Sequence, residues 1–190
     1  MKLKILITLF CIASMAMAQQ PRKMIEKFFP APDVEINTPS FGQDGYVKYE
    51  ELIKYIEGTI AGKDYISLQY IGETQKGKKI PAVVFKKSND AKAKVMFTGR
   101  VHGDEPGSTE ALLFLIDRLV NDPALSQFAD NLDIAILPMI NIDGGDKLRR
   151  QTANGLDLNR DMSKLVTPEN QALRGFFNRF APDVALDLHE

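Results

Sequence analysis

Apolar residues recur along the chain with two different spacings, which predict helices and strands that alternate. In three segments they return every three or four residues, as on one face of an α-helix. These predicted helices span residues 49–60, 109–120 and 168–180. Short apolar runs between them are typical of buried strands. The strand-like runs are residues 66–71, 80–85, 94–98, 132–137 and 184–188.

This alternation predicts an α/β fold with a mixed, mostly parallel sheet flanked by helices. The first two strand-like runs are joined by the turn-rich segment Gly72–Gly77, so we expect an antiparallel hairpin at that point. Residues 19–45 contain four prolines and show little periodicity, which predicts an extended leader. We therefore place the folded domain in residues 46–190.

The first eighteen residues have the pattern of a secretory signal peptide. Lys2 and Lys4 precede an apolar core, Ile5–Ala13, and Ala16-Met17-Ala18 forms a small-residue cleavage site. The apolar core has about half the length that a membrane-spanning helix needs. We expect cleavage after Ala18, export to an extracellular or periplasmic location, and no membrane span. Cys11 is the single cysteine of the chain, so the exported form would contain no disulfide.

The composition is that of an ordinary globular protein. Of 190 residues, 44% are hydrophobic and 26% are charged, and the formal net charge is −1. The balanced charge and the lack of a basic stripe argue against a nucleic-acid partner.

The candidate chemistry centres on the segment Gly99–Gly107, which joins a strand-like run to a helical one. It contains His102 and Glu105, and the other histidine of the chain, His189, directly follows the last strand-like run. Catalytic zinc sites use three ligands drawn from His, Glu and Cys. Parallel strands that end at the same edge of a sheet bring their terminal side chains together. The sequence therefore predicts one zinc ion per chain, held by these three residues.

A long segment without periodicity, residues 139–166, separates the fourth strand-like run from the last helix, and we expect it to be irregular. It contains the cationic residues Arg149, Arg150 and Arg160. Such a loop can simply be solvated, but planar guanidinium groups suit carboxylates and developing oxyanions. Loops of this length inside compact domains are usually functional. We interpret this one as an anion-binding wall that faces the zinc.

Four motifs in this order resemble the zinc carboxypeptidases typified by pancreatic carboxypeptidase A. The motifs are His102-x-x-Glu105, Asn141-x-Asp143-Gly144, Asp157-Leu158-Asn159-Arg160 and Asp187-Leu188-His189. The resemblance runs from about Tyr46 to the end of the chain. It implies the carboxypeptidase fold and a zinc metallocarboxypeptidase activity, which removes C-terminal residues from peptides. The expected partner is a peptide with a free C-terminal carboxylate.

The resemblance also implies a role for each matching residue. The zinc ligands would be His102, Glu105 and His189. Asp157 would bind and orient the first ligand histidine, while Arg150 would polarise the scissile carbonyl and stabilise the oxyanion. Asn159 and Arg160 would bind the terminal carboxylate of the substrate. Arg149, adjacent to Arg150, leaves the register of the catalytic arginine open.

The sequence departs from the family pattern in three places. Ile142 replaces the usual proline, and Asp161 stands where asparagine is common. The third departure is that the catalytic glutamate of the family and its specificity pocket lie downstream of the third ligand, whereas this sequence ends one residue after His189. We therefore expect a fragment that lacks the C-terminal part of the domain and its general base, and that is inactive alone. Glu190 is not expected to be the base, because neighbouring strand residues point to opposite faces.

Two other functions remain as alternatives. A zinc deacylase of the aspartoacylase and succinylglutamate desuccinylase type shares His-x-x-Glu and a later histidine, although export and the arginine-rich loop count against it. A non-catalytic module that binds zinc or carboxylates is the second alternative.

Overall fold

A computed structural model describes residues 36–39 and 46–190. The predicted signal peptide, residues 1–18, and most of the predicted leader, residues 19–45, lie outside the described residues. Within that leader, residues 36–39 form neither helix nor strand. The described residues belong to one compact unit, and no helix among them is long and apolar enough to cross a membrane.

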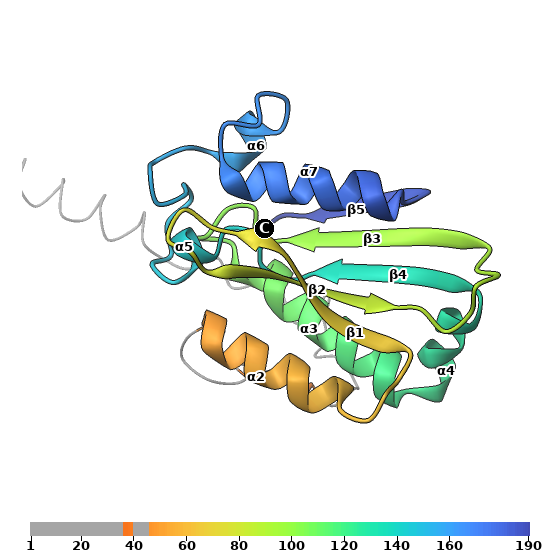
Figure 1. The fold of residues 1–190 in the computed structure, drawn as a ribbon. Helices are drawn as coiled ribbons and strands as arrows, with labels where there is room; N and C mark the ends of the chain where they lie inside the picture. Colours follow the sequence, from red (N-terminus) through yellow and green to blue (C-terminus); the bar gives the residue numbers. More distant parts are fainter. Residues whose placement is uncertain (1–35, 40–45) are drawn as a thin grey trace, which may run out of the picture. The chain divides into compact units, whose positions relative to one another are not determined.

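Five strands form one sheet in the described residues, in the order β1-β2-β4-β3-β5 (Figure 1). The strands are β1 (Ile66–Glu73), β2 (Lys79–Phe85), β3 (Ala93–Gly99), β4 (Leu132–Leu137) and β5 (Val184–Leu188). β1 and β2 form the predicted antiparallel hairpin, and β2 also pairs antiparallel with β4. β3 pairs parallel with both β4 and β5. Four of these strands therefore share one direction, which confirms the mixed, mostly parallel sheet.

Helices cover both faces of the sheet, with α2 and α3 on one side and α7 on the other (Figure 1). The longer helices are α2 (Tyr49–Ile60), α3 (Pro106–Asn121) and α7 (Pro168–Phe180). The short ones are α4 (Pro123–Ser126), the 3-10 turn η1 (Gln127–Asp130), α5 (Ile142–Gly145) and α6 (Leu158–Asp161). α3 begins three residues earlier than its apolar spacing predicts, because a proline is well suited to the first helical position.

The segment 139–166 was expected to be irregular, but it contains the single-turn helices α5 and α6. Each begins at a capping side chain. Asn141 accepts a hydrogen bond from the backbone N–H of Gly144, and Asp157 accepts one from Asn159. Such caps satisfy backbone donors at a helix start without any hydrophobic periodicity, so the apolar pattern could not reveal these turns.

The hydrophobic core lies mainly between the sheet and the pair α2 and α3. Fully buried side chains meet there from both layers: Leu52, Ile56, Phe85, Leu113, Ile116 and Ile136. By contrast, Val184 and Leu186 of β5 remain about half exposed in the described residues. The best-packed part of the molecule thus supports β3 and β4, while β5 lies at the edge of the sheet.

Arg100, which directly follows β3, is a buried cation that fixes the turn after this strand. Its side chain is fully buried, and its guanidinium donates hydrogen bonds to the carbonyl oxygens of Gly103 (3.1 Å), Val47 (3.1 Å) and Gly145 (3.2 Å). Its φ of 53° places the backbone in the left-handed region, which non-glycine residues rarely adopt. Because Gly103 follows His102, the guanidinium holds the peptide beside that histidine.

Candidate metal centre

The two histidines meet because β3 and β5 are parallel neighbours. Gly99, the last residue of β3, is paired with Leu188, the last residue of β5. His102 lies in the turn after β3, and His189 follows β5 directly. Both side chains therefore reach the same edge of the sheet, as the positions of the two apolar runs predicted.

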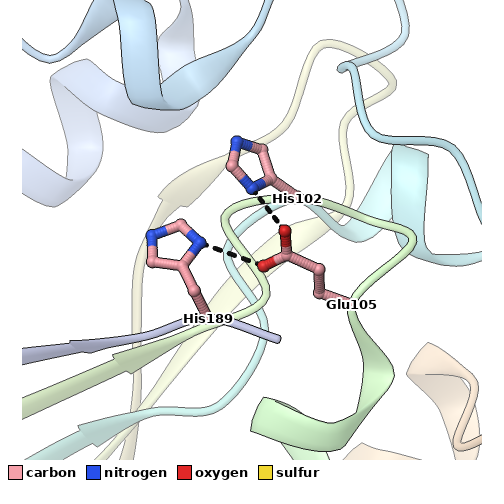
Figure 2. A group of neighbouring side chains, drawn as sticks. All are labelled: His102, Glu105 and His189. Atoms are coloured by element: carbon pink, nitrogen blue, oxygen red, sulfur yellow. Dashed lines mark hydrogen bonds and ion pairs between the residues drawn. The ribbon is translucent and has the colours of Figure 1, made fainter.

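His102, Glu105 and His189 form a compact cluster at this edge (Figure 2). Nδ1 of His102 lies 2.8 Å from one carboxylate oxygen of Glu105, and Nδ1 of His189 lies 3.0 Å from the other. One ligand atom from each residue falls within 4.8 Å of the other two, and no second group of this kind occurs in the described residues. His102 is 2% exposed and His189 is 32% exposed, so the cluster opens to solvent on the side of His189.

The donor set and its charge suit a divalent metal ion. Burial raises the pKa of Glu105, but hydrogen bonds from His102, the backbone N–H of Glu190 and His189 outweigh burial and hold this pKa below its ordinary value. The carboxylate is therefore ionised at neutral pH and lies between two imidazole nitrogens. Two histidines and one glutamate are the ligands of one class of catalytic zinc site, which keeps a further position open for water or substrate.

Asp157 lies behind His102, where the resemblance placed it. Its Oδ1 is 3.1 Å from Nε2 of His102, and the same oxygen accepts a hydrogen bond of 2.9 Å from the N–H of Asn159. Burial raises the pKa of Asp157, but these contacts and the charge of Arg150 outweigh burial and hold the pKa below its ordinary value. An ionised carboxylate at Nε2 favours a proton on that nitrogen, so Nδ1 is the nitrogen that can give up its proton and bind a metal.

Arg150, rather than Arg149, faces the centre. Its Nε lies 3.2 Å from Asp157, and its Nη1 lies 3.5 Å from Glu105. Arg149 is exposed, and its side chain makes no hydrogen bond or ion pair with any of the described site residues. This geometry favours the assignment of the catalytic arginine to position 150.

Asn159 and Arg160 lie on α6, beside the centre but not in contact with the three-residue cluster. Asp157 caps the start of α6, so this helix is anchored to His102 through its cap. The Arg160 side chain is exposed and has no ion pair within the described part of the chain. Its charge is therefore available to an anionic ligand.

The loop that carries Arg160 is held by the buried carboxylate of Asp161. Four hydrogen bonds reach this carboxylate, from the N–H groups of Val166 and Thr167 (both 2.9 Å), from the Thr167 hydroxyl (2.6 Å) and from the Asn170 amide (3.1 Å). Burial raises the pKa of Asp161, but the hydrogen bonds outweigh burial and lower the pKa from 3.8 to about 2. Asparagine, which is common here in the family, would turn an NH₂ group toward one of these donors.

We expect Asp161→Asn to lower the free energy of unfolding by roughly 2 kcal/mol at pH 7, from the size of the pKa shift. The folded-state pKa lies below the unfolded value, so this stabilisation is complete above about pH 5 and is lost as the pH falls toward 2. Urea unfolding at pH 7 and at pH 2.5 measures the difference between the proteins. The exposed Asp90, exchanged for asparagine, is the matched control. If Asp161→Asn lowered the free energy of unfolding by the same amount at both pH values, this account would be contradicted.

Glu190 does not direct its carboxylate toward the centre. Its backbone N–H donates to Glu105 at 3.3 Å, while its side chain accepts a 2.8 Å hydrogen bond from the N–H of Gly107 in the first turn of α3. The carboxylate therefore caps a helix start, in agreement with the expectation that it is not the general base.

The roles of two residues at the centre were not predicted. No local pattern indicates that Arg100 is buried, because an arginine in a polar turn is normally exposed. Asp187, whose Oδ2 lies 3.0 Å from Nε2 of His189, carried a detectable signal. It precedes His189 by two residues, and residues at this spacing in a strand share one face.

The fold and the site together define an α/β protein with a two-histidine, one-glutamate centre of the type that holds catalytic zinc. The profile of the zinc carboxypeptidase family matches residues 52–183, more than half of the chain. The chain therefore belongs to the zinc carboxypeptidase family, whose cofactor is zinc.

Individual relatives agree with this membership. Carboxypeptidase 2 of Trichophyton rubrum is 26% identical over 171 residues, which cover 85% of this chain and 32% of the relative. Carboxypeptidase SOL1 of Arabidopsis thaliana is 30% identical over 154 residues, which cover 76% of this chain and 30% of the relative. The chain thus spans about a third of the length of these relatives.

The fold matches that of solved carboxypeptidases. The crystal structure of carboxypeptidase A from Helicoverpa armigera superposes with a TM-score of 0.69 at 23% identity. The superposition covers 76% of this chain and 46% of the insect enzyme. This likeness confirms the architecture that the sequence predicted.

Proposed function

We propose that the protein is a zinc-dependent metallocarboxypeptidase that removes C-terminal residues from peptides with a free carboxylate. The observation that carries the proposal is the cluster of His102, Glu105 and His189 beside the cationic groups of Arg150 and Arg160. When bound, zinc supplies the Lewis acidity that polarises a carbonyl and activates water.

The residues of the chain have distinct roles in this proposal. His102, Glu105 and His189 hold the metal, and Asp157 orients His102. Asn159 and Arg160 bind the terminal carboxylate, so they place the last peptide bond beside the metal. Arg150 leaves its contacts with the carboxylates and donates to the carbonyl oxygen as negative charge develops there. A well-placed donor of this type contributes about 3 to 4 kcal/mol to transition-state stabilisation.

A pair of peptides that differ only at the C-terminus tests the function. The complete gene product, loaded with zinc, is incubated with a peptide that ends in a free carboxylate and with its C-terminal amide. We expect release of the last residue from the free acid alone, because the amide offers no charge to Arg160. Mass spectrometry follows the products.

Other results of this experiment would favour the alternative functions. Equal cleavage of the two peptides, or cleavage inside them, would reject the carboxypeptidase. Hydrolysis of N-acylated amino acids but not of peptides would favour the zinc deacylase. Stable zinc binding without any hydrolysis would favour a binding module.

We also propose that the protein is exported, with cleavage between Ala18 and Gln19. The charged, apolar and small-residue regions of residues 1–18 support this proposal. N-terminal sequencing of the protein purified from its own host should start at Gln19. Recovery of soluble cytoplasmic protein that retains Met1 would contradict export.

A further inference from the structure

A chain of hydrogen bonds runs from the buried face of β3 to His189. Oδ2 of Asp187 lies 3.0 Å from Nε2 of His189, and its Oδ1 lies 2.9 Å from the hydroxyl of Thr98. Thr98 and Asp187 are direct partners in the pairing of β3 with β5, and Thr98 is 5% exposed. The order of contacts is therefore Thr98, Asp187, His189 and Glu105.

The two histidines of the centre have the same pattern of contacts. Each places Nδ1 against the carboxylate of Glu105 and Nε2 against an aspartate. For His102 this aspartate is Asp157, and for His189 it is Asp187. A carboxylate that accepts the second N–H of a metal-binding histidine fixes the position of the ring proton and the orientation of the ring.

We propose that Asp187 is the positioning residue for His189, and that Thr98 holds Asp187 in place. The inference deepens the proposed function, since it concerns how the same centre holds zinc. A proton on Nε2, donated to Asp187, leaves the lone pair of Nδ1 directed at the metal position. Asp187 thereby serves His189 as Asp157 serves His102.

His189 depends on its aspartate more than His102 does. His102 is 2% exposed and lies in the turn that Arg100 holds through Gly103. The His189 side chain is 32% exposed, and the hydrogen bonds that the structure gives it are those to Glu105 and Asp187. Without Asp187, the ring is free to turn and to exchange the positions of its two nitrogens.

The surroundings of Asp187 allow it to be changed without disturbing the core. Asp187 lines a cavity of about 230 Å³ between β5 and α7, together with Thr98 and Arg174. Alanine at this position therefore enlarges an existing space, and asparagine has nearly the size and shape of aspartate. We expect Asp187→Ala and Asp187→Asn to fold.

Nuclear magnetic resonance reports the protonation of each histidine ring. The signals are simple to assign, because His102 and His189 are the two histidines of the whole chain. In protein labelled with ¹⁵N-histidine and loaded with zinc, we expect both rings to carry their proton on Nε2 and to bind the metal through Nδ1. In Asp187→Ala, the signals of His189 should change and the Nε2 proton should exchange faster with water. The signals of His102 should remain.

Zinc affinity, measured by competition with a chromophoric chelator, gives a second readout. Asp187→Ala should bind zinc about 10- to 100-fold more weakly. Asp187→Asn keeps a carbonyl acceptor and should recover part of this loss, while Thr98→Val should lose only a few-fold. The control is Asp104→Asn, which removes one negative charge from an exposed position next to the centre and should keep affinity within about twofold of wild type, because it breaks no hydrogen bond to a ligand.

The proposal is overturned if folded Asp187→Ala binds zinc as tightly as wild type and leaves the His189 signals unchanged. A loss in Asp104→Asn equal to that in Asp187→Ala would also overturn it, because net charge would then explain the effect. Neither readout needs hydrolysis. If the protein cleaves no peptide, the proposed function is rejected, while zinc affinity and the spectra still decide whether Asp187 positions His189.

Discussion

Purified protein is expected to bind about one zinc ion per chain, and His102→Ala is expected to lose this binding. The substitution removes one of three protein ligands and also leaves Asp157 without its imidazole partner. Loss of a residue that merely orients a ligand weakens metal binding by 10- to 100-fold. We therefore expect loss of the ligand itself to weaken zinc binding by more than about 100-fold.

Metal analysis after dialysis and a thermal melt with added zinc measure this effect. Zinc at about 1,000 times its Kd stabilises a protein by about 4 kcal/mol, so the wild-type melting temperature should rise and that of His102→Ala should not. Because His102 is buried, the more exposed His189→Ala provides a second test that is less dependent on folding. Unchanged stoichiometry in both variants, with native circular dichroism, would reject the site.

The second large effect is expected at the arginines of the loop, in the complete gene product. Arg150→Ala should lower kcat by about 10²- to 10³-fold with little change in KM, because the negative charge that it stabilises exists only in the transition state. Arg160→Ala should instead raise KM by about 10- to 100-fold, because the carboxylate that it binds is charged in ground and transition states alike.

Arg149→Ala is the matched control for both variants. It removes the same side chain from the adjacent position, where no hydrogen bond or ion pair reaches the described site residues, and it should behave as wild type. Steady-state kinetics on a free-acid peptide separate the three proteins, and zinc content is checked because Arg150 also contacts Glu105. A large decrease of kcat in Arg149→Ala would mean that Arg149, and not Arg150, is the catalytic arginine. If Arg150→Ala mainly raised KM and Arg160→Ala mainly lowered kcat, the roles assigned to the two arginines would be reversed.

Much of the fold was determined by local patterns. β4 and β5 have the predicted bounds, and β1 and β2 form the predicted hairpin. α7 begins after the Thr167 cap with Pro168 in its first turn, as its sequence indicates. These features depend on residues a few positions apart, for which periodicity and capping are reliable guides.

The ligands of the candidate centre could be predicted from the sequence because histidine is rare in this chain. With two histidines, each just after a strand-like run, few pairings of ligands were available. The position of Asp157 and the choice among the arginines came from family resemblance. The structure adds the contacts of Arg150 with Asp157 and Glu105 that favour it over Arg149.

The tertiary structure alone decided the order of the strands and the surroundings of the centre. Insertion of β4 between β2 and β3 makes β3 the neighbour of β5 and so brings His189 to Glu105, 84 residues away in the chain. Arg100 is buried because Val47 and Gly145 offer it carbonyl oxygens from distant segments. Such contacts form between groups that are far apart in sequence, and their geometry depends on how the layers pack, which a local pattern does not encode.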